Sequence, residues 1–258
     1  MTSTRLIAHE TRYELLSLVR NRQSMFFSVI MPILFLVIFV ATFGNNTETI
    51  NGHEIKLSTF YVPSLAAMGI ISATFVSLGI SATIQRESGV LKRRRATPIS
   101  AMMIIIGRCT AAVCLAILIV VLLVAIGKIA YGVRVPISTM PALIVTVMLG
   151  SVCFCSLGYV VASLVASADS APAVIQSIIL PLYFFSGVFI PDSSLPMILK
   201  NIANFFPVSH LAKALLATFD PSTTGSGFSW IDLAVLAAWG AAGLILAMRR
   251  FSWIPKTT

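Results

Sequence analysis

A strongly basic segment between two long apolar runs constrains the fold more than any other feature of this sequence. It extends from Gln85 to Ser100, Q-R-E-S-G-V-L-K-R-R-R-A-T-P-I-S, and contains five of the 18 Lys and Arg residues of the chain. A charged side chain costs about 3 kcal/mol or more at the centre of a bilayer, so this segment is expected to lie outside the membrane. Because the flanking runs are apolar enough to lie inside it, the basic segment is predicted to be a cytoplasmic loop of a membrane protein.

The composition supports the membrane class. Hydrophobic residues make up 57% of the chain and charged residues only 10%, whereas soluble domains carry about 25% charged residues. The net charge of +9 is therefore interpreted as the excess of Lys and Arg that keeps loops on the cytoplasmic side of a membrane. It is not interpreted as a nucleic-acid-binding surface. No nucleic-acid partner is expected.

The predicted fold is an all-α integral membrane protein with six spans. A spanning helix needs about 20 mostly apolar residues. Six segments qualify, namely Met25–Phe43, Thr59–Ile84, Ile99–Ile126, Pro141–Ala166, Ala171–Ile190 and Trp230–Met248. If the N-terminus is inside, thirteen of the 18 Lys and Arg residues lie on the cytoplasmic side. This asymmetry predicts that both termini are cytoplasmic.

Local patterns refine this picture. Small residues recur at every fourth position in three spans: Gly69, Ala73, Ser77 and Ser81, then Gly158, Ala162 and Ala166, then Ala234, Ala238 and Ala242. Such seams predict close helix packing. Ser229 and Asp232 have the spacing of a helix-capping box, so a structural role is predicted for Asp232. Pro181 and the pair Ser186-Gly187 predict that the fifth span breaks before Pro191, so that residues 187–228 form an external, re-entrant region.

No catalytic or metal-binding pattern is visible. The phosphate-binding motif G-x-x-x-x-G-K-[ST] is absent, and the three His residues are far apart. The four Cys residues lie in apolar runs, and no Asp or Glu lies centrally in a predicted span. The chain is thus not expected to be an enzyme, to hold a metal or cofactor, or to move a proton or ion through buried carboxylates.

Two segments resemble the ABC-2 type permeases of ATP-binding-cassette exporters. Residues 86–98, R-E-S-G-V-L-K-R-R-R-A-T-P, are similar to the family pattern R-E-x-G-x-[LM]-[KE]-x-L-x-[AV]-[TS]-P between spans two and three. Residues 180–191, L-P-L-Y-F-F-S-G-V-F-I-P, are similar to the family signature S-G-x-x-[FY]-P at the end of span five. Arg94 departs from the first pattern, because an apolar residue is common at its position.

The resemblance implies a multi-pass permease of the cell membrane, of the type V exporter kind and most similar to the daunorubicin and multidrug branch. Residues 1–24 would form a cytoplasmic interfacial helix and residues 25–258 the six-span domain. The loop 85–98 would contain a coupling helix that binds an ATPase. The implied ATPase-coupling residues are Arg86, Glu87, Gly89, Leu91, Lys92, Arg93, Arg94, Arg95, Thr97 and Pro98. The implied partners are two ATP-binding subunits, which hold ATP and Mg, and a second permease chain.

The substrate is expected to be a hydrophobic or amphipathic compound, such as a drug or antibiotic. Candidate residues for its path are Phe75, Phe184, Phe185, Ser186 and Gly187, although aromatic side chains in spans usually serve packing and Ser186-Gly187 favours a helix break. Export of polysaccharide, lipid or ions is an alternative within the family. Outside it, the alternatives are a secondary carrier without an ATPase and a non-transporting assembly or receptor protein.

Overall fold

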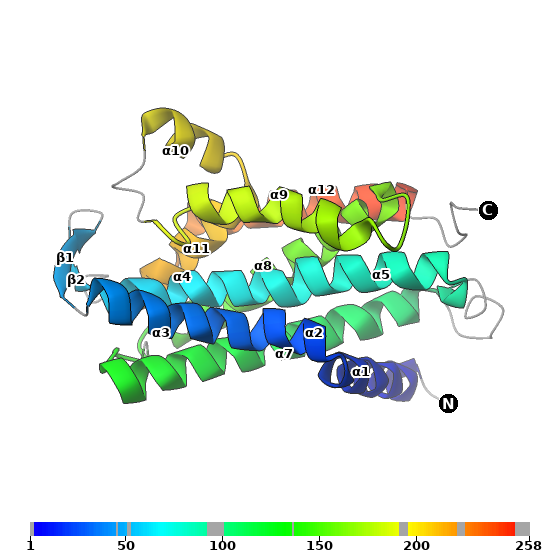
Figure 1. The fold of residues 1–258 in the computed structure, drawn as a ribbon, viewed down its shortest axis with the longest axis horizontal. Coiled ribbons are helices and arrows are strands. Elements are labelled where there is room, and N and C mark those ends of the chain that lie inside the picture. The colour runs from blue at the N-terminus through cyan, green and yellow to red at the C-terminus, as the bar shows by residue number, and fades with distance from the viewer. Residues whose placement is uncertain are drawn as a thin grey trace.

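The structure is a computed structural model that describes residues 3–44, 46–50, 53–91, 101–135, 137–190, 196–220 and 225–250 (Figure 1). Its elements are α1 (Ser3–Arg20), α2 (Arg22–Met25), η1 (Phe26–Ile30), α3 (Met31–Phe43), β1 (Thr47–Ile50), β2 (His53–Lys56), α4 (Leu57–Ile71), η2 (Ser72–Val76), α5 (Ser77–Glu87), α7 (Ala101–Tyr131), α8 (Met140–Leu164), α9 (Ala171–Phe185), α10 (Met197–Ala203), α11 (Pro207–Phe219) and α12 (Trp230–Arg250). The elements η1 and η2 are single π-helical segments within longer helices.

Among the described residues, five helices are long and apolar enough to cross a membrane. They are Phe26–Phe43, Leu57–Glu87, Met103–Tyr131, Met140–Leu164 and Trp230–Arg250. These correspond to the predicted spans one, two, three, four and six. A bent pair, α10 with α11, raises the number to six if it counts as one span. The all-α membrane fold is therefore confirmed.

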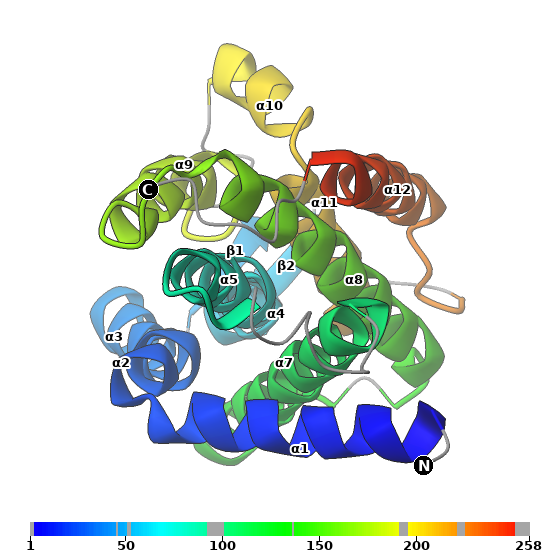
Figure 2. The same cartoon turned by 90° about the vertical axis from the view of Figure 1, so that its right-hand side faces the viewer.

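The second span, formed by α4, η2 and α5, lies at the centre of the bundle. Its most apolar stretch is 89% buried within this single chain, compared with 28% for the first span and 22% for the last. Figure 2 shows α3, α7, α8 and α9 arranged around it. The small residues predicted to line this span do face a neighbouring helix, because Gly69 lies against Ile119 of α7. The second span is thus the element against which its neighbours pack.

The two ends of the bundle differ in character. Helix α1 runs across the bundle axis at the end where α5 and α12 finish, and the hairpin β1–β2 lies at the opposite end with α10 (Figures 1 and 2). Both terminal helices therefore reach the same end, as the charge asymmetry predicts. By that asymmetry this end is cytoplasmic, and a helix lying across the axis there has the orientation expected of an interfacial helix.

The predicted fifth span ends earlier than expected. Helix α9 has 15 residues, which is about 22 Å and shorter than the ~30 Å hydrocarbon core. The helix stops at Phe185, and Gly187 adopts a φ of +74°, a conformation that ends helices and favours glycine. The predicted break at Ser186-Gly187 is confirmed, whereas the predicted helical span to Ile190 is wrong.

Two further features define the outer end of the bundle. The strands β1 and β2, between the first two spans, pair antiparallel with Thr47 opposite Lys56. The chain after Ala203 turns by 93° into α11, which is mostly buried. This bent pair agrees with the re-entrant region predicted for residues 187–228. Pro207 occupies the first turn of α11, where proline is compatible with a helix.

The small residues predicted in the fourth span also allow close packing, at Gly158. A Cβ on Gly158 would lie 3.1 Å from Phe75 O and 3.2 Å from Thr74 O, both in η2. The predicted seam of the sixth span is not used inside this chain. Ala234, Ala238 and Ala242 are exposed, and α12 instead meets α8 through Gly240 and Gly243. Packing of this seam against a second chain stays a prediction.

Candidate functional site

The side chain of Arg86, at the cytoplasmic end of α5, is completely buried. Its Nη1 donates to Ala162 O at 2.6 Å and its Nη2 to Val165 O at 2.6 Å. Its Nε donates to Glu87 Oε1 at 2.6 Å, and the two side chains are 0% and 6% exposed. The carbonyl groups at the end of a helix lack intrahelical partners and carry partial negative charge. Arg86 therefore binds the C-terminal end of α8.

The short turn after α8 is held by its own hydrogen bonds. Ser167 Oγ donates to Ser170 Oγ at 2.9 Å, and Ser170 N donates to Ser167 Oγ at 3.2 Å. Helix α9 starts directly afterwards, since Val174 N bonds to Ser170 O at 3.0 Å. The residues that Arg86 binds are therefore only a few positions from the start of α9.

The loop that follows α5 begins with a tight turn. Gly89 has a φ of +70° and its N donates to Arg86 O at 3.1 Å, which is a common way to end a helix. Leu91 is buried, with 1% of its surface exposed. Of the predicted coupling residues that are described, Arg86, Glu87 and Leu91 thus face their own chain. The others, Lys92, Arg93, Arg94, Arg95, Thr97 and Pro98, lie outside the described residues.

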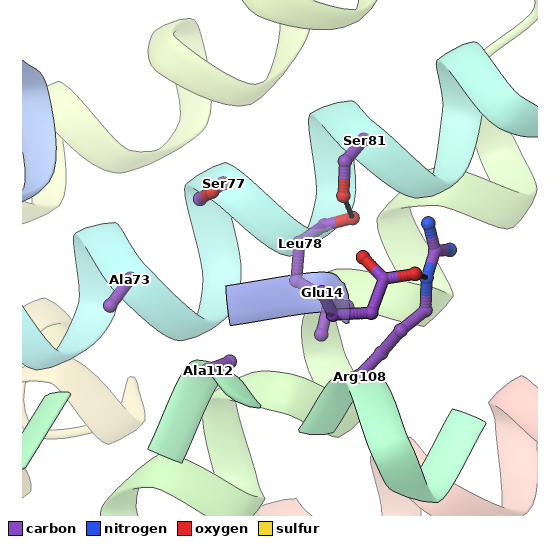
Figure 3. A pocket seen from close by; sticks show the side chains of 7 residues that line it. All are labelled: Glu14, Ala73, Ser77, Leu78, Ser81, Arg108 and Ala112. Carbon is purple, nitrogen blue, oxygen red and sulfur yellow. Dashed lines mark hydrogen bonds and ion pairs between the residues drawn. The ribbon is translucent and has the colours of Figure 1, made fainter. Parts of the chain in front are cut away.

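Helix α1 is bound to the start of α7 by a second buried ion pair (Figure 3). Arg108 Nε donates to Glu14 Oε1 at 2.9 Å, and the side chains are 4% and 12% exposed. The two helices approach closely because Gly107 has no side chain, and a Cβ there would lie 2.9 Å from Glu10 Cβ. The sequence placed Arg108 on the cytoplasmic side but gave no indication of this partner, because the two residues are 94 positions apart.

The ion pair lines a small pocket between α1, α5 and α7 (Figure 3). Its empty volume is about 260 Å³, part of which is open to the surroundings. The lining residues are Glu14, Ala73, Ser77, Leu78, Ser81, Arg108 and Ala112. None of the residues predicted for the substrate path lies in it. The pocket is therefore a small recess with a mixed polar and apolar lining.

The residues predicted for the substrate path fall in two places. Phe75 is buried and lies edge-on to Phe154, with ring centres 6.4 Å apart. Phe184 is 48% exposed and contacts Phe189, with ring centres 5.1 Å apart. Phe185 is half-buried, and Ser186 and Gly187 are buried in the turn that ends α9. That these five residues line one substrate path stays a prediction.

Aromatic packing joins the break after α9 to the first two spans, which the sequence did not indicate. The ring of Phe189 lies 5.3 Å from Phe35 and 5.7 Å from Phe39, both on α3. Phe39 also contacts Tyr61 of α4, with centres 5.1 Å apart. Edge-to-face ring pairs of this kind contribute about 0.5–1.5 kcal/mol each beyond area burial. The segment after α9 is therefore fixed to spans one and two.

At the outer end, His210 of α11 connects two acceptors. Its Nδ1 lies 2.6 Å from Asp232 Oδ1 and its Nε2 lies 2.8 Å from Asn204 O. A carboxylate and a backbone carbonyl only accept, so both contacts together require a proton on each ring nitrogen. Ser229 also bonds the Asp232 carboxylate. Asp232 therefore contacts Ser229 at the start of its own helix and also joins α11 to α12, and its purely structural role stays a prediction.

Comparison with known proteins agrees with the two motifs and with the helical bundle. The family model described as ABC-2 type transporter matches residues 6–219, which include most of α1 and every later element through α11. The chain belongs to the ABC-2 type transporter family. It is a multi-pass membrane permease of the cell membrane.

The curated relatives that match share only about a quarter of the residues in the matched region. Two proteins named "Probable multidrug ABC transporter permease YbhR", from Escherichia coli K12 and O157:H7, are each 26% identical over 152 residues. The matched region covers 58% of this chain and 41% of each relative. The ABC-2 family and the multidrug permease name of these relatives are consistent with a membrane subunit whose ATPase is a separate protein.

Proposed function

We propose that this permease is the membrane subunit of an ATP-driven exporter that moves a hydrophobic or amphipathic, drug-like substrate outward. ATP hydrolysis takes place in a separate subunit that holds ATP and Mg. The observation that carries the proposal is the match of residues 6–219 to the ABC-2 family, together with the basic segment 85–98 that follows a rigidly fixed helix end. The multidrug name of the relatives supports the substrate class.

The architecture of the cytoplasmic end supports docking of an ATPase there. Helix α1 lies across this end of the bundle and is fixed to α7 by Glu14 and Arg108. The end of α5 is fixed to α8 by Arg86. A partner that binds the loop after α5 therefore contacts elements that are connected to several spans. Two ATP-binding subunits and a second copy of the permease, or a sister chain, complete the proposed complex.

Transport into inverted membrane vesicles tests the energy source. Vesicles that contain the permease and its ATPase are expected to accumulate daunorubicin when Mg-ATP is supplied. Accumulation continues when an ionophore collapses the proton gradient, and it stops with vanadate, because the chain has no central carboxylates with which to use the gradient. Vesicles with the permease alone are the control. Uptake that needs no ATP and ends when the gradient collapses would identify a secondary carrier instead, and an absence of ATP-dependent daunorubicin uptake would contradict the substrate class.

A further inference from the structure

The environment of Arg86 is unusual for a charged residue at the membrane surface. Its guanidinium is fully buried, and each of its three nitrogens donates a hydrogen bond of 2.6 Å. Burial of an ion costs several kcal/mol unless its hydrogen bonds and charge are satisfied. Here Glu87 supplies the opposite charge and α8 supplies two carbonyl oxygens. A residue placed only to contact a partner protein or lipid headgroups does not need this environment.

The carbonyl partners make the contact specific to arginine. Ala162 O and Val165 O are three residues apart at the end of α8, and each receives one terminal nitrogen of the same planar group. A guanidinium presents its donors in a fixed fork, whereas a lysine ammonium is a single point charge on a flexible chain. The fork therefore fixes both the distance and the orientation of α5 relative to the end of α8.

The contact also connects the end of α5 to the end of α8 and, through a short turn, to the start of α9. On one side, α5 leads directly into the turn at Gly89 and the basic loop. On the other side, Val165 leads into the hydrogen-bonded turn at Ser167–Ser170 and then α9. Helices α5 and α8 also meet above the clamp, where a Cβ on Gly79 would lie 3.4 Å from Gly158 O. The end of span two, the end of span four and the start of span five thus share one junction.

We propose that Arg86 is a positioning residue that makes this junction a single rigid body, here named the Arg86 clamp (residues 86–91 with 162–170). When an ATPase displaces the loop after α5, the clamp moves the ends of α8 and α9 together with α5. The inference rests on the proposed function for the source of the movement. The clamp itself is a property of the permease alone, so the two claims can fail separately.

Distance measurements across the clamp test the proposal. Spin labels are introduced on unnatural amino acids at Ser88 and Asp169, which are exposed residues on either side of it, so that the four native cysteines remain. A pair at Asp169 and Ser177, both on the α9 side, controls for label motion. In the wild-type complex the Ser88–Asp169 distribution is expected to be narrow and the same without nucleotide and with Mg-ATP and vanadate. A shift of this distance between the two states would overturn the proposal.

Variants of Arg86 and Glu87 distinguish a positioning role of Arg86 from a role in stability alone. Arg86→Gln removes the fork and is expected to broaden the Ser88–Asp169 distribution in detergent, and to lower severalfold the substrate moved per ATP hydrolysed. Arg86→Lys is expected not to restore either property. Glu87→Gln keeps both carbonyl contacts and is expected to retain the narrow distribution. An unchanged distribution in Arg86→Gln contradicts the clamp. If no ATPase binds, the proposed function fails, but the comparison of wild type with Arg86→Gln in detergent still decides the clamp.

Discussion

Glu14→Ala is expected to lower the free energy of unfolding by about 3–5 kcal/mol, because it leaves a buried guanidinium without its charged partner. Arg108 is only 4% exposed and its Nε bonds directly to Glu14. The change also removes the contact that fixes α1 to α7, so α1 is expected to separate from the bundle first. Equilibrium unfolding in mixed detergent micelles, followed by circular dichroism, measures the loss.

Two controls identify the cause of this loss. Arg12 is exposed on the same helix, and Arg12→Ala is expected to change stability by no more than about 0.5 kcal/mol. The double variant Glu14→Leu with Arg108→Met removes both charges and is expected to recover most of the stability, since apolar replacements of buried pairs are often neutral. The account of the ion pair is wrong if Glu14→Ala costs no more than Arg12→Ala.

Gly158→Leu is expected to destabilise the bundle by more than about 3 kcal/mol and to reduce the yield of folded protein. The obstacle is backbone: a Cβ at residue 158 lies 3.1 Å from Phe75 O, and a carbonyl in η2 cannot rotate away as a side chain can. Gly158→Ala is expected to cost about 1–3 kcal/mol for the same reason. Thermal unfolding in detergent, with size-exclusion profiles, measures both variants.

Val152→Leu provides the matched control for this change. Val152 lies on the same helix and is 54% exposed, so an added methylene group there meets no backbone. Its melting temperature is expected to remain within one or two degrees of wild type, roughly the effect of a neutral surface substitution. If the melting temperature falls equally in Gly158→Leu and Val152→Leu, then the composition of the helix, rather than the close approach of α8 to η2, limits stability.

Composition and charge predicted the parts of the fold that depend on the bilayer. Helices that cross hydrocarbon need long apolar runs, so the first span was predicted at Met25–Phe43 and is observed at Phe26–Phe43. The fifth span was overestimated because Val188, Phe189 and Ile190 are apolar. After the helix has ended, Val188 is buried and Phe189 packs against Phe35 and Tyr183, and hydropathy does not distinguish a helix from a packed turn.

The candidate site was harder to predict from the sequence. The R-E-x-G motif drew attention to Arg86, but a charge beside a basic loop suggests exposure, and the structure buries it. Its partners are backbone carbonyls 76 and 79 residues away, and backbone atoms leave no signature in the side-chain sequence. Glu14 was missed because the sequence alone does not mark which face of α1 packs on the bundle. The packing of α1 on Gly107 defines that face.

Affinity purification of the tagged permease from its own host in mild detergent tests the central claim most directly. The account predicts a stoichiometric soluble protein with a G-x-x-x-x-G-K-[ST] motif, and predicts that it is lost when Arg93, Arg94 and Arg95 are replaced by glutamine. Replacement of Arg249 and Arg250, exposed at the same end of the bundle, is the matched control and should retain the partner. Recovery of the permease alone in several mild detergents would contradict an ATP-driven exporter and favour a secondary carrier.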